Sequence, residues 1–260
     1  MTQKKKTILV TGATGGIGQA VCRRLAASGA DLVLAARNES RLAETCKVLN
    51  ESNSVNCSWI GVDLANESSV SDFAAEIAKR DLALDGVVVM PPQISPTNDC
   101  LPSNDAWRAM FDGSFIGPLA LLKAAIDQRR PGGRFKVVII SGISSAQVLG
   151  HYATSNVLRC AWLAEAKTLA FAFGDKGIHV NTLSLGGTLT PGYTENLKKR
   201  AAAHGMSFEE RLADETSNIP LKKYGAPEEV AVAAEGLLSA FSDHMTGLNI
   251  MCDGGFTRSY

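Results

Sequence analysis

Short apolar runs alternate with longer segments of helical periodicity along this chain of 260 residues. The runs are rich in valine, isoleucine and leucine and are bounded by turn-forming residues, which is typical of buried strands. Because strands that alternate with helices form right-handed βαβ units, the pattern predicts an α/β fold, a doubly wound parallel seven-stranded sheet with helices on both faces. The expected strands lie at 7–10, 31–35, 58–62, 86–90, 135–140, 178–183 and 248–252.

The segments between the strands differ in regularity. Gly113-Ser114 interrupts the longest predicted helix and is expected to bend it. The irregular segment at about 187–219 is expected to hold one short helix and to form a mobile lid over the ligand edge of the sheet. No repeat or linker divides the chain, so residues 1–260 are expected to form a single domain. Helices are predicted at 39–49, 67–79, 105–130 and 227–241, with another that begins at or just after Tyr152.

Composition narrows the kind of partner. The chain has 26 basic and 26 acidic residues and therefore no net charge, which disfavours nucleic acid and anionic membranes. The six cysteines show no paired spacing, so reduced thiols in a cytoplasmic protein are expected. We expect neither a leader nor an apolar run of about 18 residues that would span a bilayer. A small-molecule partner fits these features.

The stretch from Thr11 to Gly18 joins the first expected strand to a helix. Gly12 allows a tight turn, Gly16 lets the backbone approach a pyrophosphate, and Gly18 lets the helix and the strand pack closely. A phosphate would lie against the helix N-terminus, where free N–H groups favour an anion. An ordinary glycine-rich turn is the alternative, because such a match alone is weak.

The residues that follow the second and third expected strands indicate which dinucleotide would bind. An acidic side chain after the second strand would accept a hydrogen bond from the ribose 2′-hydroxyl, whereas an arginine pairs with a 2′-phosphate. The chain has Ala36-Arg37 there, which favours NADP(H); the alternative is a surface arginine. Asp63 is placed to meet an adenine amino group, or it is a turn aspartate.

Polar and stiff residues gather at the expected ligand edge. Prolines in 91–96 leave a rigid segment after the fourth strand. Tyr152 and Asn156 are four residues apart and share one helical face. His151 and His179 have no partners at metal-ligand spacing, so no metal site is expected.

These motifs together resemble the single-domain branch of the short-chain dehydrogenase/reductase family, and the likeness covers nearly the whole chain. The resemblance implies a Rossmann-like fold and ketoreductases of the 3-oxoacyl-ACP reductase type as the nearest activity. The motifs that carry it are Thr11-Gly-x-x-x-Gly-x-Gly18, Asp63-Leu64, Trp107 through Gly117, Tyr152, Ile178-x-Val-Asn181, Ile219-Pro-Leu, Gly225-x-Pro-Glu-Glu-Val230, Thr246-Gly247 and Asp253-Gly-Gly255.

The family uses a tyrosine as general acid or base, with a lysine four residues later that lowers the pKa of the tyrosine and holds the nicotinamide ribose. Tyr152 matches the tyrosine, whereas Asn156 stands where the lysine is expected and brings no positive charge. Ser114 stands in place of the catalytic asparagine. The resemblance thus implies an atypical active site on an intact scaffold.

The substrate-binding serine of the family lies thirteen residues before the tyrosine, which here is Ile139, inside a strand. Alignment by the end of the strand places Gly142 there instead. Ser144 is the best substitute hydroxyl, with Ser141 behind it.

The resemblance also implies a set of cofactor-binding residues. Met90-Pro91-Pro92 replaces the usual Asn-Ala-Gly, and Thr190 is spaced to contact the nicotinamide carboxamide. The full set is Gly12, Thr14, Gly15, Gly16, Ile17, Gly18, Arg37, Asp63, Leu64, Met90, Asn156, Gly186, Thr188 and Thr190.

Two functions remain open from sequence. The first is an NADPH-dependent carbonyl reductase for 3-oxoacyl or other keto substrates, with acyl carrier protein or CoA as carriers that such substrates use, in which neutral Tyr152 favours reduction over oxidation. The second is a catalytically degenerate or repurposed member that binds nucleotide or a partner, or performs a non-redox step. A lysine substituted at position 156 should raise turnover if the protein is a carbonyl reductase. It should leave turnover unchanged if the protein is a degenerate or repurposed member. A homo-oligomer, a tetramer or dimer, is expected through the long helices.

Overall fold

The computed structural model describes residues 5–259. Seven parallel strands form one sheet in the order β3-β2-β1-β4-β5-β6-β7, which confirms the doubly wound fold. Each strand lies where the apolar runs predicted it, with its ends shifted by at most about two residues. The strands are β1 (Thr7–Thr11), β2 (Asp31–Ala36), β3 (Cys57–Gly61), β4 (Gly86–Val89), β5 (Phe135–Gly142), β6 (Ile178–Leu185) and β7 (Asn249–Cys252).

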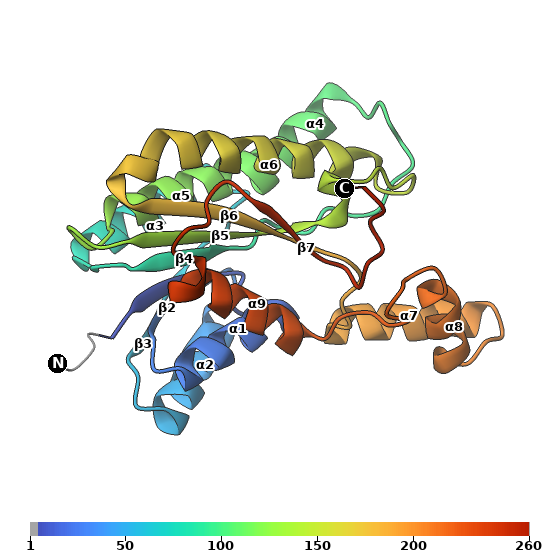
Figure 1. Ribbon diagram of the computed structural model, residues 1–260, viewed down its shortest axis with the longest axis horizontal. Coiled ribbons are helices and arrows are strands. Elements are labelled where there is room, and N and C mark those ends of the chain that lie inside the picture. The colour runs from blue at the N-terminus through green and yellow to red at the C-terminus, as the bar shows by residue number, and fades with distance from the viewer. Residues whose placement is uncertain (1–4, 260) are drawn as a thin grey trace.

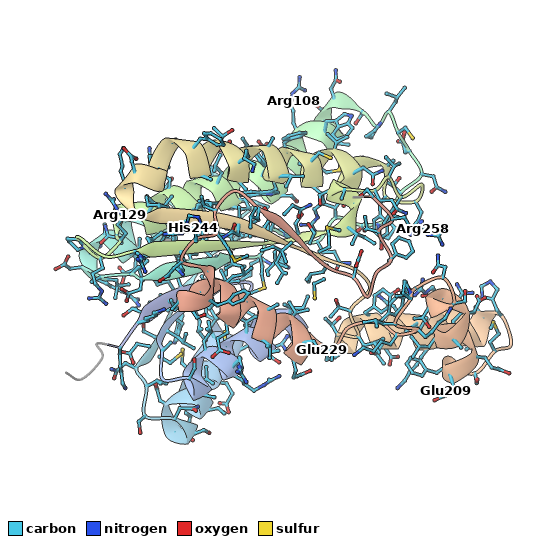
Figure 2. The ribbon with its side chains drawn as sticks, in the orientation of Figure 1. Arg108, Arg129, Glu209, Glu229, His244 and Arg258 are labelled. Carbon is cyan, nitrogen blue, oxygen red and sulfur yellow. The ribbon has the colours of Figure 1, made fainter. Side chains whose placement is uncertain are left out.

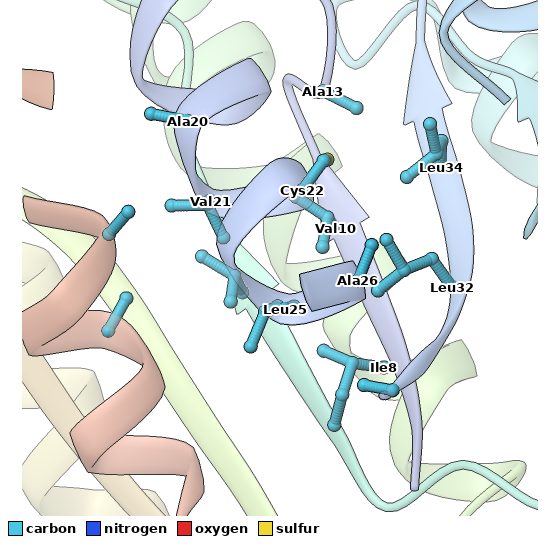
Figure 3. Close-up of a cluster of buried hydrophobic side chains, with 14 of the residues drawn as sticks. Ile8, Val10, Ala13, Ala20, Val21, Cys22, Leu25, Ala26, Leu32 and Leu34 are labelled. Atoms are coloured by element: carbon cyan, nitrogen blue, oxygen red, sulfur yellow. The ribbon is translucent and has the colours of Figure 1, made fainter. Parts of the chain in front are cut away.

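Helices cover both faces of the sheet (Figure 1). Each face has its own cluster of buried apolar side chains, because successive side chains of a strand point to opposite faces. Figure 3 shows one cluster, in which Val21 and Leu25 pack beside Ile8 of β1 and Leu32 of β2. One face is covered by α1 (Gly16–Ala27), α2 (Glu39–Ser52) and α9 (Pro227–Leu238), and the other by α3 (Glu67–Lys79), α5 (Gly117–Asp127) and α6 (Ala153–Phe173).

The long helix expected at 105–130 is interrupted at the predicted place. It consists of α4 (Asn104–Phe111), a π-helical turn over Asp112–Ile116 and α5, and Gly113-Ser114 lies within that turn. A Cβ on Gly117 would overlap the carbonyl oxygen of Leu64, so only glycine allows α5 to approach the segment after β3 this closely.

The expectation that no segment is long and apolar enough to cross a membrane was wrong. The 24-residue stretch Asn104–Asp127 passes that test by length and hydropathy. Its α5 part packs on α3 and β4 and buries Leu121, Leu122 and Ala125. The apolar character of this stretch therefore serves the core of the sheet in this structure.

The segment after β6 holds two helices, where the sequence predicted one. They are α7 (Pro191–Ala203) and α8 (Phe208–Thr216), and they project beyond the carboxyl ends of the strands (Figure 1). The second helix begins with a capping box at Ser207, a local signal in the printed sequence. Both ends of the segment meet, because Leu189 N–H donates to the carbonyl of Gly225 at 2.9 Å and Gly225 N–H donates to that of Gly187 at 2.9 Å.

Candidate active site

The glycine-rich turn between β1 and α1 forms an open cradle. Gly12 has φ of +60°, a conformation that L side chains rarely adopt, and a Cβ on Gly18 would overlap the carbonyl oxygen of Gly12. Gly15 caps α1 without a side chain, and the first turn contains no acidic residue. The N–H groups at this helix end are thus free to bind an anion, so the turn fits the pyrophosphate of a dinucleotide.

Two other segments reach the same turn. The N–H of Met90, just after β4, donates to Thr11 Oγ1 at 2.7 Å, and a Cβ on Gly12 would lie 3.2 Å from Met90 Cβ. A Cβ on Gly16 would lie 2.9 Å from Thr190 Cβ, at the start of the 187–219 segment. The structure therefore brings together the segments after β1, β4 and β6 at the carboxyl edge of the sheet.

The adenosine end of the expected site lies after β2 and β3. Arg37 directly follows β2 and is exposed, and Leu64 is buried after β3. One carboxylate oxygen of Asp63 accepts a hydrogen bond from Ala65 N–H at 3.1 Å. The structure therefore shows the turn contact that the sequence analysis gave as the alternative for Asp63.

The start of the 187–219 segment is held by local hydrogen bonds. Gly186 N–H donates to the carbonyl of Cys252 at 3.0 Å, and Thr188 Oγ1 donates to the carbonyl of Gly186 at 3.3 Å. Thr190 Oγ1 accepts from Tyr193 N–H at 3.2 Å and so caps α7. Its hydroxyl hydrogen is still available for a ligand oxygen.

Tyr152 caps the N-terminus of α6 and is anchored to the loop after β4. Thr97 N–H donates to the carbonyl of His151 at 2.9 Å, and Ala153 N–H donates to that of Thr97 at 3.1 Å. Burial raises the pKa of Tyr152, and so do Tyr193 and a carboxylate of the lid. The phenol is therefore neutral at neutral pH.

Four residues of α7, α8 and the loop after α8 form one hydrogen-bonded cluster around the carboxylate of Glu215. Tyr193 and Tyr224 donate their hydroxyls to Glu215 Oε2 at 3.2 Å and 3.1 Å, and Arg200 Nη2 donates to it at 3.3 Å. Arg211 Nε donates to Oε1 at 2.8 Å. Glu215 raises and Arg200 lowers the pKa of Tyr152, so this cluster sets part of the electrostatic environment of the tyrosine.

The side chain of Asn156 is bound to the loop before α6. Its Nδ2 donates to the carbonyl of Leu149 at 3.1 Å, and its Oδ1 accepts from the N–H of Leu149 at 3.3 Å. The amide expected to reach ribose hydroxyls thus holds the loop before α6. These bonds use one N–H and one lone pair of the amide, so its second N–H is still available and a contact of Asn156 with the cofactor stays a prediction.

The candidate hydroxyls have different surroundings. Ser141 Oγ, at the end of β5, is buried and finds no hydrogen-bond partner among the described residues. Ser144 is buried in a 3₁₀ turn just after β5. Ser114 is buried in the π-helical turn, where its carbonyl accepts from Trp162 Nε1 at 2.8 Å. Ser145, which the sequence analysis did not single out, shares a hydrogen bond of 3.0 Å with Ser184.

Sequence reasoning missed a charged residue at the end of β5. The Nε of Arg159 lies 3.8 Å from the position that a Cβ on Gly142 would occupy. The signal was present: thirteen residues after Gly142 stands Ser155, and four residues further stands Arg159. These are the two spacings of the family motif, displaced by three residues from Tyr152 and Asn156.

Figure 2 labels two acidic side chains in this part of the molecule, one on the projecting helices and one where the chain returns to the body. Glu209 lies on α8, whereas Glu229 lies in the first turn of α9 and accepts from Ala226 N–H at 2.8 Å where the chain returns to the body. Within residues 5–259, no group of three or more His, Cys, Asp or Glu side chains is arranged to hold a metal ion.

Known proteins resemble this chain over nearly its full length. A family model described as enoyl-(acyl carrier protein) reductase matches residues 12–257. The 3beta-hydroxysteroid dehydrogenase 1 of Eggerthella lenta is 29% identical over 98% of this chain and 94% of its own. The diacetyl reductase [(S)-acetoin forming] of Staphylococcus epidermidis is 30% identical over 96% of this chain and 98% of its own.

Two solved structures share the fold. L-sorbose reductase from Gluconobacter frateurii, complexed with NADPH and L-sorbose, superposes with a TM-score of 0.92 at 24% identity, over 99% of this chain and 98% of that one. The NADPH-bound short chain oxidoreductase from Pseudomonas aeruginosa PAO1, described as containing an atypical catalytic center, gives a TM-score of 0.87 at 24% identity, over 98% of both chains.

Proposed function

We propose an activity from one premise, which the family match and the relatives establish: this chain belongs to the short-chain dehydrogenase/reductase family and is an oxidoreductase of that type. The proposed reaction is the NADPH-dependent reduction of a carbonyl, in a 3-oxoacyl or another small keto substrate, to an alcohol. The single observation that carries this direction is the neutral phenol of Tyr152, whose pKa is raised.

The proposed cofactor is NADP(H), which supplies the hydride when it is bound. The free N–H groups of α1 would hold the pyrophosphate, and exposed Arg37 would pair with the 2′-phosphate. The solved structures with this fold include NADPH complexes, which supports the same assignment. Thr190 would donate its remaining hydroxyl hydrogen to the carboxamide.

Tyr152 would donate the proton to the substrate oxygen. A neutral phenol of raised pKa can protonate a forming alkoxide, because an alkoxide is the stronger base. Alcohol oxidation needs the phenolate, which is scarce at neutral pH when the pKa is raised. Ser144 and Ser141 are the proposed hydroxyls that polarise the carbonyl, and unpartnered Ser141 Oγ is available for such a bond.

Residues 187–219 are proposed to close over the substrate as a lid, since the start of that segment at Gly187 is hydrogen-bonded to Gly225, shortly after its end. A homo-oligomer in the cytoplasm is also proposed. Phe171 on α6 is 84% exposed, and covering such a side chain would stabilise a dimer or a tetramer.

The test is NADPH binding and turnover with the whole protein. We expect quenching or a shift of NADPH fluorescence, weaker binding of NADH, and consumption of NADPH with acetoacetyl-CoA, ethyl acetoacetate or diacetyl. Absence of NADPH binding would contradict the proposal. Binding without turnover on any ketone would favour a degenerate or repurposed member, an alternative supported by Asn156, which is occupied with Leu149.

A further inference from the structure

Within residues 5–259, no carboxylate forms an ion pair with Arg159 of α6, whose guanidinium lies beside the carboxyl end of β5. Arg159 is partly exposed, and the protein around its guanidinium lowers its pKa by desolvation, with no acidic group among the described residues opposing the effect. Its Nη1 donates to the carbonyl of Ile140 at 3.4 Å, which is a long hydrogen bond. Most of its five N–H donors are therefore available.

An unpaired buried charge is costly, and this chain avoids it elsewhere. Arg130 is also partly buried, but its Nε and Nη2 donate to the two carboxylate oxygens of Asp85 at 2.6 Å and 2.7 Å. A fold that keeps Arg159 without such a partner gives up stability, and sites that do so are commonly ligand sites. The missing acceptor is then expected to come from a ligand.

The position of Arg159 in the fold indicates which ligand atom accepts its hydrogen bonds. Tyr152, Ser155 and Arg159 follow one another at helical spacing along one face of α6, at the edge where the strands end. Gly142 stands at the strand-end position of the substrate-binding serine and has no side chain, and the guanidinium lies beside it. A positively charged group therefore stands beside the position of that serine, on a different element.

We propose that Arg159 binds the carbonyl oxygen of the substrate and stabilises the negative charge that forms there, an assignment that rests on the reductase function proposed above. The carbonyl carbon gains a hydride as NADPH is oxidised to NADP⁺, and the π electron pair moves to the oxygen. That oxygen takes the phenolic proton of Tyr152, which is replaced from water. Arg159 stays protonated throughout and contributes charge and hydrogen bonds.

The first test needs no cofactor and measures thermal unfolding of the whole protein. Arg159→Met removes an unpaired charge while keeping most of the side-chain volume, so the melting temperature should rise by about 2–5 °C. Arg130→Met is the matched control; it leaves Asp85 unpaired and should lower the melting temperature. A clear fall for Arg159→Met would show that the arginine is a structural group and would overturn the proposal.

The second test measures the kinetics of ketone reduction. Arg159→Met should lower kcat about 100-fold, as the loss of one donor to a forming oxyanion does elsewhere, with NADPH binding unchanged in fluorescence titrations. Arg159→Lys should retain part of the rate, because it keeps the charge. Methylguanidinium should restore activity to Arg159→Ala, whereas urea of the same shape without charge should not.

The outcomes separate this proposal from the function on which it rests. If the wild type reduces ketones and Arg159→Met does so at the same rate, Arg159 has no part in the reaction and the reductase function stands. If the wild type does not bind NADPH, the reductase function fails, and the proposal for the carbonyl oxygen fails with it, whatever the melting temperature of Arg159→Met.

Discussion

The side chain of Asn156 pairs with both backbone polar groups of Leu149, seven residues before it. The amide donates to the carbonyl at 3.1 Å and accepts from the N–H at 3.3 Å, and Tyr152 N–H donates to the same carbonyl at 3.0 Å. One turn of α6 thus holds the loop that precedes it. This pairing fixes the approach of the chain to Tyr152.

Lysine at position 156 is therefore expected to lower turnover rather than to raise it. Lysine has donors only and cannot accept from Leu149 N–H, so Asn156→Lys leaves that group unpaired and loosens the loop before Tyr152. We expect kcat for ketone reduction to fall several-fold and the melting temperature to drop by a few degrees, about 2–5 °C. Val157→Ala, an exposed neighbour, serves as control. A gain in turnover for Asn156→Lys would contradict this role of Asn156.

The fold could be predicted from sequence because its signals are local and repeated. Apolar runs such as 86–90 are buried on both faces and have few other interpretations, and Gly113-Ser114 marks the interruption of the long helix. The second helix after β6 was missed because α8 is only nine residues long and buries a single residue, Thr216, although its capping box at Ser207 is visible in the sequence.

The site could be predicted only in part, because its register depends on which residue is taken as the reference. When Tyr152 is taken as the tyrosine of the family motif, Asn156 stands at the position of the lysine. Counting from Gly142 at the strand end leads instead to Ser155 and Arg159. The pairing of Asn156 with Leu149 is a tertiary contact, which helical spacing cannot reveal.

Arg37 offers a test of the cofactor preference. Arg37→Glu places a negative charge where the 2′-phosphate is expected, so the affinity for NADPH should fall about 10- to 100-fold while that for NADH changes little or improves. Titration of NADPH and NADH fluorescence measures both. Arg41→Glu, which makes the same charge change on the exposed side of α2, controls for the long-range electrostatic effect of reversing one charge. Equal losses for both variants would show that Arg37 does not contact the 2′-phosphate.

Asp85 and Arg130 form a bidentate ion pair remote from the site. Asp85 also accepts from the N–H of Thr7 at 2.8 Å, so it joins β1 to the segment before β4. Asp85→Asn keeps the shape but removes the charge, and it should destabilise the protein by about 2–3 kcal/mol. Chemical denaturation measures the change. Exposed Asp105→Asn, whose ion pair with Arg108 is solvent-accessible, should change stability by less than about 1 kcal/mol.

Cys46 of α2 and Cys57 of β3 place their sulfur atoms 2.7 Å apart, and both line a groove on the surface. Hydrogen peroxide should oxidise the pair to a disulfide, with loss of two thiol hydrogens and formation of two water molecules. A disulfide stabilises the fold because it restricts the unfolded chain, and the short loop between these cysteines limits this effect. The melting temperature should rise by about 5–10 °C. Mass spectrometry after alkylation identifies the cross-link. Cys46→Ser should abolish the rise, whereas Cys100→Ser should not; a peroxide effect that persists in Cys46→Ser would contradict the pairing.

The pH dependence of alcohol oxidation tests the electrostatics of Tyr152. Burial, Tyr193 and Glu215 raise its pKa and Arg200 lowers it. Because oxidation needs the phenolate, its rate should climb with pH without a plateau below about pH 10, while reduction stays nearly constant from about pH 6 to 9. Arg200→Met removes the group that lowers the pKa and should move the oxidation profile to higher pH.

Glu215→Gln should move the pH profile of alcohol oxidation to lower pH, opposite to Arg200→Met, because it removes a negative charge that raises the pKa of Tyr152. Arg211→Met is the matched control, because Arg211 binds the same carboxylate but is not among the groups that act most strongly on Tyr152. The measurement is the initial rate of NADP⁺ reduction with a secondary alcohol at constant ionic strength. An oxidation profile that is flat between pH 7 and about 9 in the wild type would show that Tyr152 is not the titrating base.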